Sequence, residues 1–297
     1  MLRRFCLLIT LLFPTTAFAG EERNCLPEGV PLPPGWNEPY EPHRVISNLY
    51  AVGAADLSVF LITTDAGHIL INTGLEDSAS WIRANIDSLG FDFSAIKILL
   101  TTQAHFDHTA ALAEIKAMTG AKIFATPKDV PVLEDGGISD AHFGFCLDFR
   151  FPPVSVEREL ADGEVITLGN TQLTTHHHPG HTEGSSSYSM TVMENGRNYR
   201  VLIANMGTIN DGKRLVLDPT YPGVSDDFAH TFRHQKAMQV DVWVAAHGSQ
   251  YGLADKHTPG QAYSADTFFD PDGFKAEVNR LEKLYLDQVD RESGPTS

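Results

Sequence analysis

A short segment, TTQAHFDHT, places three side chains with metal-binding chemistry within four positions of one another. His105, Asp107 and His108 follow the apolar run 96–100, IKILL, which has the composition of a buried strand. Imidazole and carboxylate groups are standard zinc ligands, and a catalytic zinc site keeps one position open for water. Gln103 stands two residues before His105, and its neutral amide oxygen would be a weaker zinc ligand than an imidazole nitrogen.

Two further histidine-containing segments follow later strand-like runs. The segment THHHPGHTEGSSSY contains four histidines and AAHGSQYG contains one: His176, His177, His178, His181 and His247. Loops at strand ends are where polar side chains converge on a cleft. We therefore expect side chains from the three segments to meet in one site.

These segments offer enough donors for two adjacent zinc ions. The expected ligands are, at one position, Asp107, His108 and His247 and, at the other, Gln103, His105 and His181. Two metals about 3.5–4 Å apart activate a bridging water and stabilise both ends of the bond that is hydrolysed. Bound metal lowers the pKa of water to about 7, so hydroxide is available at neutral pH. One or two zinc ions per chain are expected.

The composition limits the compartment and the partners. Residues 1–19 carry Arg3 and Arg4, then an apolar stretch, then Ala-Phe-Ala, which is the layout of a secretory signal peptide. The apolar stretch is too short for a membrane anchor, so residues 20–297 are expected to form one exported domain. The formal net charge of −16 argues against nucleic acid or an anionic membrane surface as a partner.

The mature part of the chain begins with a proline-rich segment and keeps two cysteines. Residues 20–44 are predicted to form an extended N-terminal arm. Cys25 and Cys146 lie outside any CxxC pattern, which argues against redox or zinc–thiolate chemistry. An oxidising compartment permits a disulfide between them, and two free or partly buried thiols are the alternative.

Hydrophobic periodicity predicts the elements that would position the site. Helices are predicted at 77–89 and 109–120, and a C-terminal helix would carry on one face Phe274, Val278, Leu281 and Tyr285. Later strands are predicted at 165–177, 185–192, 199–205 and 240–246, and long loops at 131–150 and 207–228. Two successive β-then-α halves predict an α/β fold, a four-layer αββα sandwich with the sheets inside.

The motifs resemble those of the metallo-β-lactamase superfamily. The family's HxHxDH motif stands here as QAHFDH, its GHTxGS turn as GHTEGS, and its last ligand follows a late strand, here AAHGSQ. The resemblance runs from about Val45 to the C-terminal helix, and the motifs occur in the family's order. It identifies His181 and His247 as ligands. Glutamine in place of the first motif histidine, together with the export signal, resembles subclass B3 β-lactamases of the GOB type.

The resemblance implies an exported, zinc-dependent β-lactamase. Such an enzyme hydrolyses the cyclic amide C–N bond of small-molecule β-lactam antibiotics through a metal-bound hydroxide, and confers antibiotic resistance from the periplasm. Asp107 would orient the attacking hydroxide, and the chain is expected to be a monomer. A lactone, thioester or phosphoester hydrolase of the same superfamily is the alternative, and Gln103 also leaves open a non-catalytic metal-binding protein.

Several other side chains near the motifs have less definite roles. Met206 follows a strand and is expected near the cleft, where it either packs or touches substrate. Lys213 lies in a predicted loop over the site, where it either attracts a substrate carboxylate or is a solvated charge. Asn72 is expected to act on the metal site indirectly at most. His178 is the alternative ligand to His181.

Overall fold

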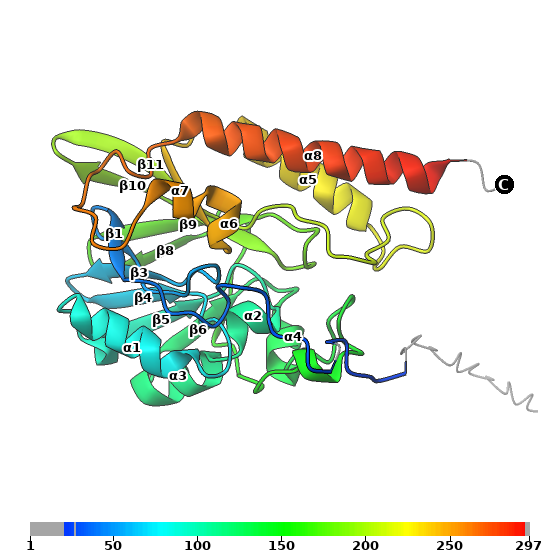
Figure 1. Cartoon of the computed structure of the whole chain (residues 1–297), viewed down its shortest axis with the longest axis horizontal. Helices are drawn as coiled ribbons and strands as arrows, with labels where there is room; N and C mark the ends of the chain where they lie inside the picture. Colours follow the sequence, from blue (N-terminus) through cyan, green and yellow to red (C-terminus); the bar gives the residue numbers. More distant parts are fainter. Residues whose placement is uncertain (1–20, 27, 295–297) are drawn as a thin grey trace, which may run out of the picture.

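Two β-sheets face each other, and helices cover the outer side of each sheet (Figure 1). A computed structural model describes residues 21–26 and 28–294, so the predicted signal peptide at 1–19 lies outside the described residues. The seven-stranded sheet has the order β1-β2-β3-β4-β5-β6-β7, and the five-stranded sheet has the order β12-β11-β10-β9-β8. This arrangement confirms the predicted α/β, four-layer fold.

The first sheet follows the chain order from edge to edge. Its strands are β1 (His43–Ile46), β2 (Leu49–Ala51), β3 (Phe60–Thr64), β4 (Gly67–Ile71), β5 (Ile96–Leu100), β6 (Lys122–Ala125) and β7 (Arg158–Glu159). The pairs from β1 to β4 are antiparallel, and those from β4 to β7 are parallel. Parallel neighbours need crossover connections, which here contain α1 (Ser78–Ser88), α2 (Phe106–Thr109), α3 (Leu112–Thr119) and α4 (Val130–Asp135).

Alternation along the strands of the first sheet sends side chains to two different cores. Ile69 and Ile71 on β4 pack in the core that faces the second sheet, whereas Leu70 packs against the helices on the outer face. On β5, Ile98 and Leu99 divide in the same way. Successive side chains of a strand point to opposite faces, so a strand that is buried on both faces is apolar at nearly every position.

The second sheet is formed by the later half of the chain. Its strands are β8 (Val165–Leu168), β9 (Thr171–His177), β10 (Ser186–Glu194), β11 (Arg197–Ala204) and β12 (Val242–Ala245). The strands from β8 to β11 pair antiparallel, and β12 pairs parallel to β11. The strand predicted at 165–177 is thus two strands, since the chain turns at Gly169 and Asn170. The helices that follow are α5 (Val224–Ala237), α6 (Gly248–Tyr251), α7 (Leu253–Lys256) and α8 (Pro271–Ser293).

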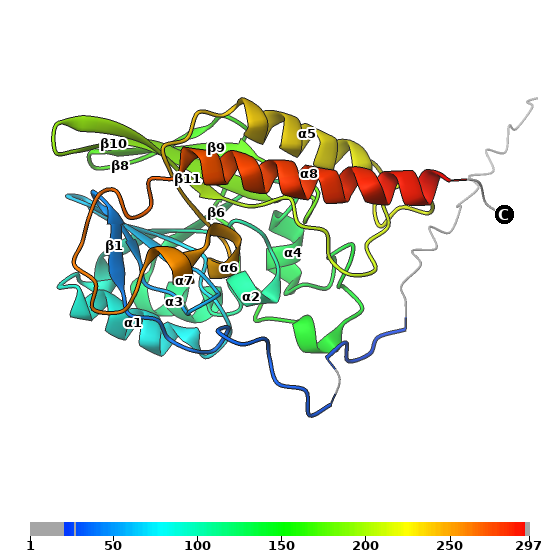
Figure 2. The same ribbon diagram turned by 45° about the horizontal axis from the view of Figure 1, so that its top comes forward.

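Helix α8 lies beside α5 over the outer face of the second sheet (Figure 2). Its four predicted core residues, Phe274, Val278, Leu281 and Tyr285, are buried. The helix begins where Asp270 accepts a hydrogen bond from the Gly273 N–H, with Pro271 in the first turn. Within residues 21–26 and 28–294, the helices lack the combination of length and apolar character that a membrane crossing requires.

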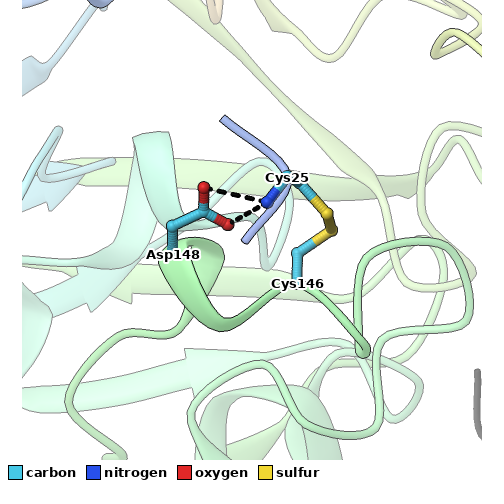
Figure 3. Close-up of side chains that lie close together, drawn as sticks. All are labelled: Cys25, Cys146 and Asp148. Carbon is cyan, nitrogen blue, oxygen red and sulfur yellow. Dashed lines mark hydrogen bonds between the residues drawn. A yellow bond between two sulfur atoms is a disulfide. The ribbon is translucent and has the colours of Figure 1, made fainter. Parts of the chain in front are cut away.

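The N-terminal arm is tied to the loop between α4 and β7. Cys25 and Cys146 form a disulfide with their Cα atoms 5.4 Å apart, which resolves the two alternatives for these cysteines (Figure 3). Asp148 accepts the backbone N–H of Cys25 at 2.8 Å and of Leu26 at 2.5 Å. The sulfur atoms are joined to each other, so this Cys–Cys–Asp cluster offers no thiolate ligand. The arm ends where β1 begins at His43.

The two predicted long loops contain more helix than their composition indicates. The first, 131–150, overlaps α4 and contains a 3-10 turn, η2 (Leu147–Phe149). The second, 207–228, runs into α5, which begins at Val224. Asp140 in the first loop lies 3.4 Å from His105, and Lys213 in the second loop donates to carbonyl oxygens of the segment after β9, so both loops help to surround the site.

Candidate metal centre

The three sequence motifs come from strand ends of both sheets. The first motif leaves the end of β5 and enters α2, with His105 preceding the helix and Asp107 and His108 within it. His181 lies in the loop after β9, and His247 immediately precedes α6, two residues after β12. The sheets are joined at this edge, because the Ser58 N–H donates to the Ala246 carbonyl at 2.9 Å.

Asp107, His108 and His247 bring their donor atoms together. One potential ligand atom from each lies within 4.8 Å of the other two. Asp107 Oδ2 is 3.1 Å from His108 Nε2 and 3.5 Å from His247 Nε2. Donors 2.0–2.2 Å from a tetrahedral zinc ion lie about 3.3–3.6 Å apart. Both ring nitrogens of His108 are buried without a hydrogen-bond partner in the described chain, as expected of a group that faces a metal. The donor set therefore fits zinc.

The charges of this first group also suit a cation. Burial alone would raise the pKa of Asp107, but His108 and His247 outweigh it and hold that pKa well below its ordinary value. Burial lowers the pKa of His108, despite the opposing effect of Asp107. The group therefore combines an ionised carboxylate with a neutral imidazole, which are the forms that bind metal.

His247 is oriented by Asp56, a residue that no sequence motif indicated. Asp56 Oδ2 lies 3.2 Å from His247 Nδ1, and its other oxygen accepts the Ser249 N–H at 2.8 Å. A carboxylate behind a ligating histidine fixes the ring and its tautomer. Burial alone would lower the pKa of His247, but hydrogen bonds to Asp107 and Asp56 raise it to about 9.

The second predicted group lies beside the first and contains an unusual donor. The rings of His105 and His181 are 4.9 Å apart between centroids. Gln103 is 2% exposed, and its Oε1 has no hydrogen-bond partner among residues 21–26 and 28–294. A buried amide oxygen without a partner is costly, and a cation would satisfy it. Two imidazoles and this amide oxygen are a donor set that suits a second zinc ion, and their assignment as ligands stays a prediction.

His181 is fixed by the chain that passes over it. Its Nδ1 lies 2.9 Å from the Thr208 carbonyl oxygen, which leaves Nε2 as the free ring nitrogen. Burial, together with the nearby His105, lowers the pKa of His181 well below its ordinary value. The neutral ring with one nitrogen anchored and one free has the state that a metal ligand requires.

The other histidines of the second motif make contacts away from this centre. His178 Nδ1 lies 2.6 Å from Ser187 Oγ, and its Nε2 lies 2.8 Å from His234 Nδ1. His176 Nε2 lies 2.7 Å from Ser189 Oγ. These contacts tie β9 to β10 and α5, so His178 is not among the side chains that meet at the centre.

Lys213 occupies a different position from the exposed loop that its sequence context suggested. It is 3% exposed, and its ammonium donates to the carbonyl oxygens of Gly180 at 3.1 Å and His181 at 2.7 Å. Burial lowers its pKa to about 8. Its hydrogen bonds hold the loop that carries His181, so the expectations of a solvated charge and of a substrate contact are both corrected.

Met206 packs in the core, and Asn72 supports the backbone just before the first motif. Met206 is 1% exposed and packs in the core between the sheets, so the substrate contact expected of it is corrected. Asn72 has a positive φ of 65°, a conformation that asparagine tolerates better than most residues. Its Oδ1 accepts the Thr102 N–H at 2.8 Å, which fixes the segment just before Gln103.

Comparisons with known proteins agree with this geometry. A family model described as "Metallo-beta-lactamase superfamily" matches residues 53–192. The metallo-beta-lactamase GOB-18 from Elizabethkingia meningoseptica has a similar structure, with a TM-score of 0.85 and 43% identity over 91% of this chain and 100% of that one. The class B3 di-zinc metallo-beta-lactamase LRA-12 from an Alaskan soil metagenome has a TM-score of 0.83 and 42% identity over 91% and 100%.

Curated relatives are more distant and carry other names. The acyl-coenzyme A thioesterase MBLAC2 of Gallus gallus is 30% identical over 55% of this chain and 55% of its own length. A hydroxyacylglutathione hydrolase of Maricaulis maris is 35% identical over 33% of this chain and 30% of its own. The chain thus spans about half or less of the length of these curated relatives.

Proposed function

Because the chain belongs to the metallo-β-lactamase superfamily, we propose that it is a zinc-dependent β-lactamase that opens the ring of β-lactam antibiotics. One observation carries the proposal: Asp107, His108 and His247 bring donor atoms within 4.8 Å of one another, in a chain that covers the full length of a similar β-lactamase. The proposed ligands are Asp107, His108, His247, Gln103, His105 and His181.

The residues of the chain divide the work of such a site. Zinc, when bound, supplies a water that loses its proton near neutral pH and a Lewis acid for the carbonyl oxygen and the leaving nitrogen. Asp107 keeps one ionised carboxylate at the centre, where we propose that it orients the attacking water. Asp56 holds the His247 ring in place. Ser185 accepts the Thr182 N–H at 2.8 Å, so it supports the turn and is not proposed as a nucleophile.

We propose that the enzyme acts in the periplasm, as a monomer, on small molecules. The disulfide between Cys25 and Cys146 supports an oxidising compartment, because such bonds rarely persist in the cytosol. The formal net charge of −16 disfavours nucleic acid as a substrate. Thioester hydrolysis is the second candidate activity, since thioesterase and hydroxyacylglutathione hydrolase names occur among the curated relatives.

The first prediction tests the activity and the ligands together. The wild-type chain should hydrolyse a chromogenic cephalosporin, lose that activity to a chelator and regain it with zinc. Asp107→Ala and His247→Ala should each lower the rate by at least about a hundredfold, because several kcal/mol of charge stabilisation are lost. His176→Ala is the matched control, since His176 bonds Ser189 outside the centre, and it should keep its activity.

The same variants separate the alternatives. Rapid turnover of an acyl thioester with no cephalosporin hydrolysis would favour the second candidate. Zinc binding without turnover of either substrate would leave a metal-binding protein. Normal rates and normal zinc content in Asp107→Ala or His247→Ala would show that the ligand assignment is wrong.

A further inference from the structure

Asp140 is a buried acid beside the metal centre that no motif indicated and that the proposed reaction does not use. It lies in the loop between α4 and η2, and its side chain is 9% exposed. One carboxylate oxygen, Oδ1, accepts the backbone N–H groups of His142 at 2.8 Å and Phe143 at 2.5 Å. The other oxygen, Oδ2, lies 3.4 Å from Nε2 of His105.

The His105 ring is enclosed by the same loop. Its Nε2 is buried and forms no hydrogen bond within the described residues. Asp140 Oδ2 is therefore the acceptor that an N–H at this nitrogen would bond. The Phe143 ring contacts the His105 ring at 5.1 Å between centroids. Catalytic hydrogen bonds are often long before a site is loaded and shorten when it is. A small rotation of the ring would bring the 3.4 Å contact to hydrogen-bond length.

The chemistry of the pair determines which nitrogen carries the proton. An ionised carboxylate only accepts hydrogen bonds, and a neutral imidazole has one N–H donor and one bare nitrogen. The nitrogen that faces Asp140 should therefore be the N–H, which leaves Nδ1 bare. Only a bare nitrogen binds a metal.

We propose that Asp140 is a positioning residue for His105 that holds this imidazole in the tautomer whose Nδ1 binds zinc. The inference rests on the proposed zinc site and deepens it. A carboxylate behind a ligating histidine also makes the ring a stronger donor. That matters most at this position, because the third donor is the weak amide oxygen of Gln103. Asp140 thus acts for His105 as Asp56 acts for His247.

The substitution Asp140→Asn distinguishes this role from a structural one. Asparagine has one side-chain oxygen, which should stay with the N–H groups of His142 and Phe143 and keep the loop turn. Its NH₂ group would then face His105 Nε2 and donate to it. The proton would move to Nδ1, where it blocks the metal. Asp140→Asn should therefore weaken binding of the second zinc equivalent by about 10–100-fold, as much as Asp140→Ala or more.

Two measurements test the proposal on the full chain. The first is a zinc titration of chelator-treated protein, in which the first equivalent should change little and the second should weaken as stated. The second is ¹⁵N NMR of the His105 ring in the zinc-free protein. It should show a proton on Nε2 in the wild type and on Nδ1 in Asp140→Asn. Asp148→Asn is the matched control, because Asp148 also accepts two backbone N–H groups, those of Cys25 and Leu26 in the N-terminal arm, and bonds no histidine among the described residues.

The outcomes are distinct. If Asp140→Asn keeps the zinc affinity of the wild type and Asp140→Ala loses it, the role of Asp140 is structural and the proposal fails. A wild-type His105 with its proton on Nδ1 also overturns it, without any variant. If the wild-type chain binds no zinc, the proposed function fails, and the NMR measurement still decides the tautomer.

Discussion

Gln103 carries a neutral amide oxygen, and we propose that it shares a zinc ion with the imidazoles of His105 and His181. The oxygen is buried and has no partner in the part of the chain that the structure describes, so it is available to a cation. An amide oxygen is nevertheless a weaker zinc donor than an imidazole nitrogen. The position of Gln103, His105 and His181 should therefore fill after that of Asp107 and its partners, and one zinc ion could suffice for activity.

Gln103→His should raise the affinity for the second zinc equivalent and affect the first much less, because a stronger donor is placed at the second position. Gln103→Ala should lower the second affinity. A zinc titration of the three proteins measures both effects. If Gln103→Ala bound two zinc ions as tightly as the wild type, Gln103 would not be a ligand, and its amide would point elsewhere.

Asp129 is a second buried acid close to the His181 turn, and it behaves differently from Asp140. It is 2% exposed and accepts a hydrogen bond from the Thr182 hydroxyl at 3.1 Å. Burial raises its pKa to about 7. The folded chain therefore holds this proton more tightly than the unfolded chain, in which the pKa is ordinary. The stability that protonation contributes is complete below about pH 4 and is lost as the pH rises towards 7.

Asp129→Asn should remove this pH-dependent loss of stability, because an amide does not ionise as the pH rises. Relative to the wild type, the variant should gain about 2–3 kcal/mol in the free energy of unfolding between pH 5 and pH 8. Urea unfolding of the metal-free proteins at the two pH values measures the gain. An equal difference between the proteins at both pH values would mean that Asp129 is already ionised at pH 5.

At the scale of the elements, strong periodicity made most of the strands and helices predictable. The apolar run of β5 and the i, i+4 pattern of α1 specify their own structure, and the first site motif follows β5 directly. Helix α4 was missed because Val130–Asp135 is short and contains a proline. The break between β8 and β9 was missed because both flanks alternate well enough to read as one strand.

In the candidate site, the proposed ligands could be predicted from the sequence, and the residues that support them could not. The six proposed ligands lie in recognisable motifs, because a metal needs several donors at fixed spacings from a few strand ends. Asp56 and Asp140 were not predicted, since each is a single acid in an irregular segment and acts through one histidine. The burial of Lys213 was also not predicted. Its partners are carbonyl oxygens, which leave no trace in the sequence.

At the scale of the molecule, the disulfide fixes the N-terminal arm to the loop that carries Asp140. It joins residues 121 positions apart. A bond that closes a loop of this length restricts the unfolded chain strongly, and removal of a native disulfide costs about 2–5 kcal/mol.

The double substitution Cys25→Ser, Cys146→Ser should lower the free energy of unfolding by about 2–4 kcal/mol. Denaturant unfolding of the wild type with and without a reductant, beside the double variant, measures the loss. The reductant should destabilise the wild type to the level of the variant and leave the variant unchanged. Equal stability of all the samples would show that the bond contributes nothing to the folded state.

The division of the chain between its two sheets has a consequence for its assembly. The exposed turn at 161–163 separates β7 from β8, so a single cut there would leave two fragments, each with one whole sheet. Gln103, His105, Asp107 and His108 would go to one fragment, and His181 and His247 to the other. Each of the two proposed zinc positions would lose at least one of its proposed ligands. The proposed metal centre therefore needs side chains from both fragments. Zinc bound by a mixture of the two fragments would measure how far they reassemble into the native fold.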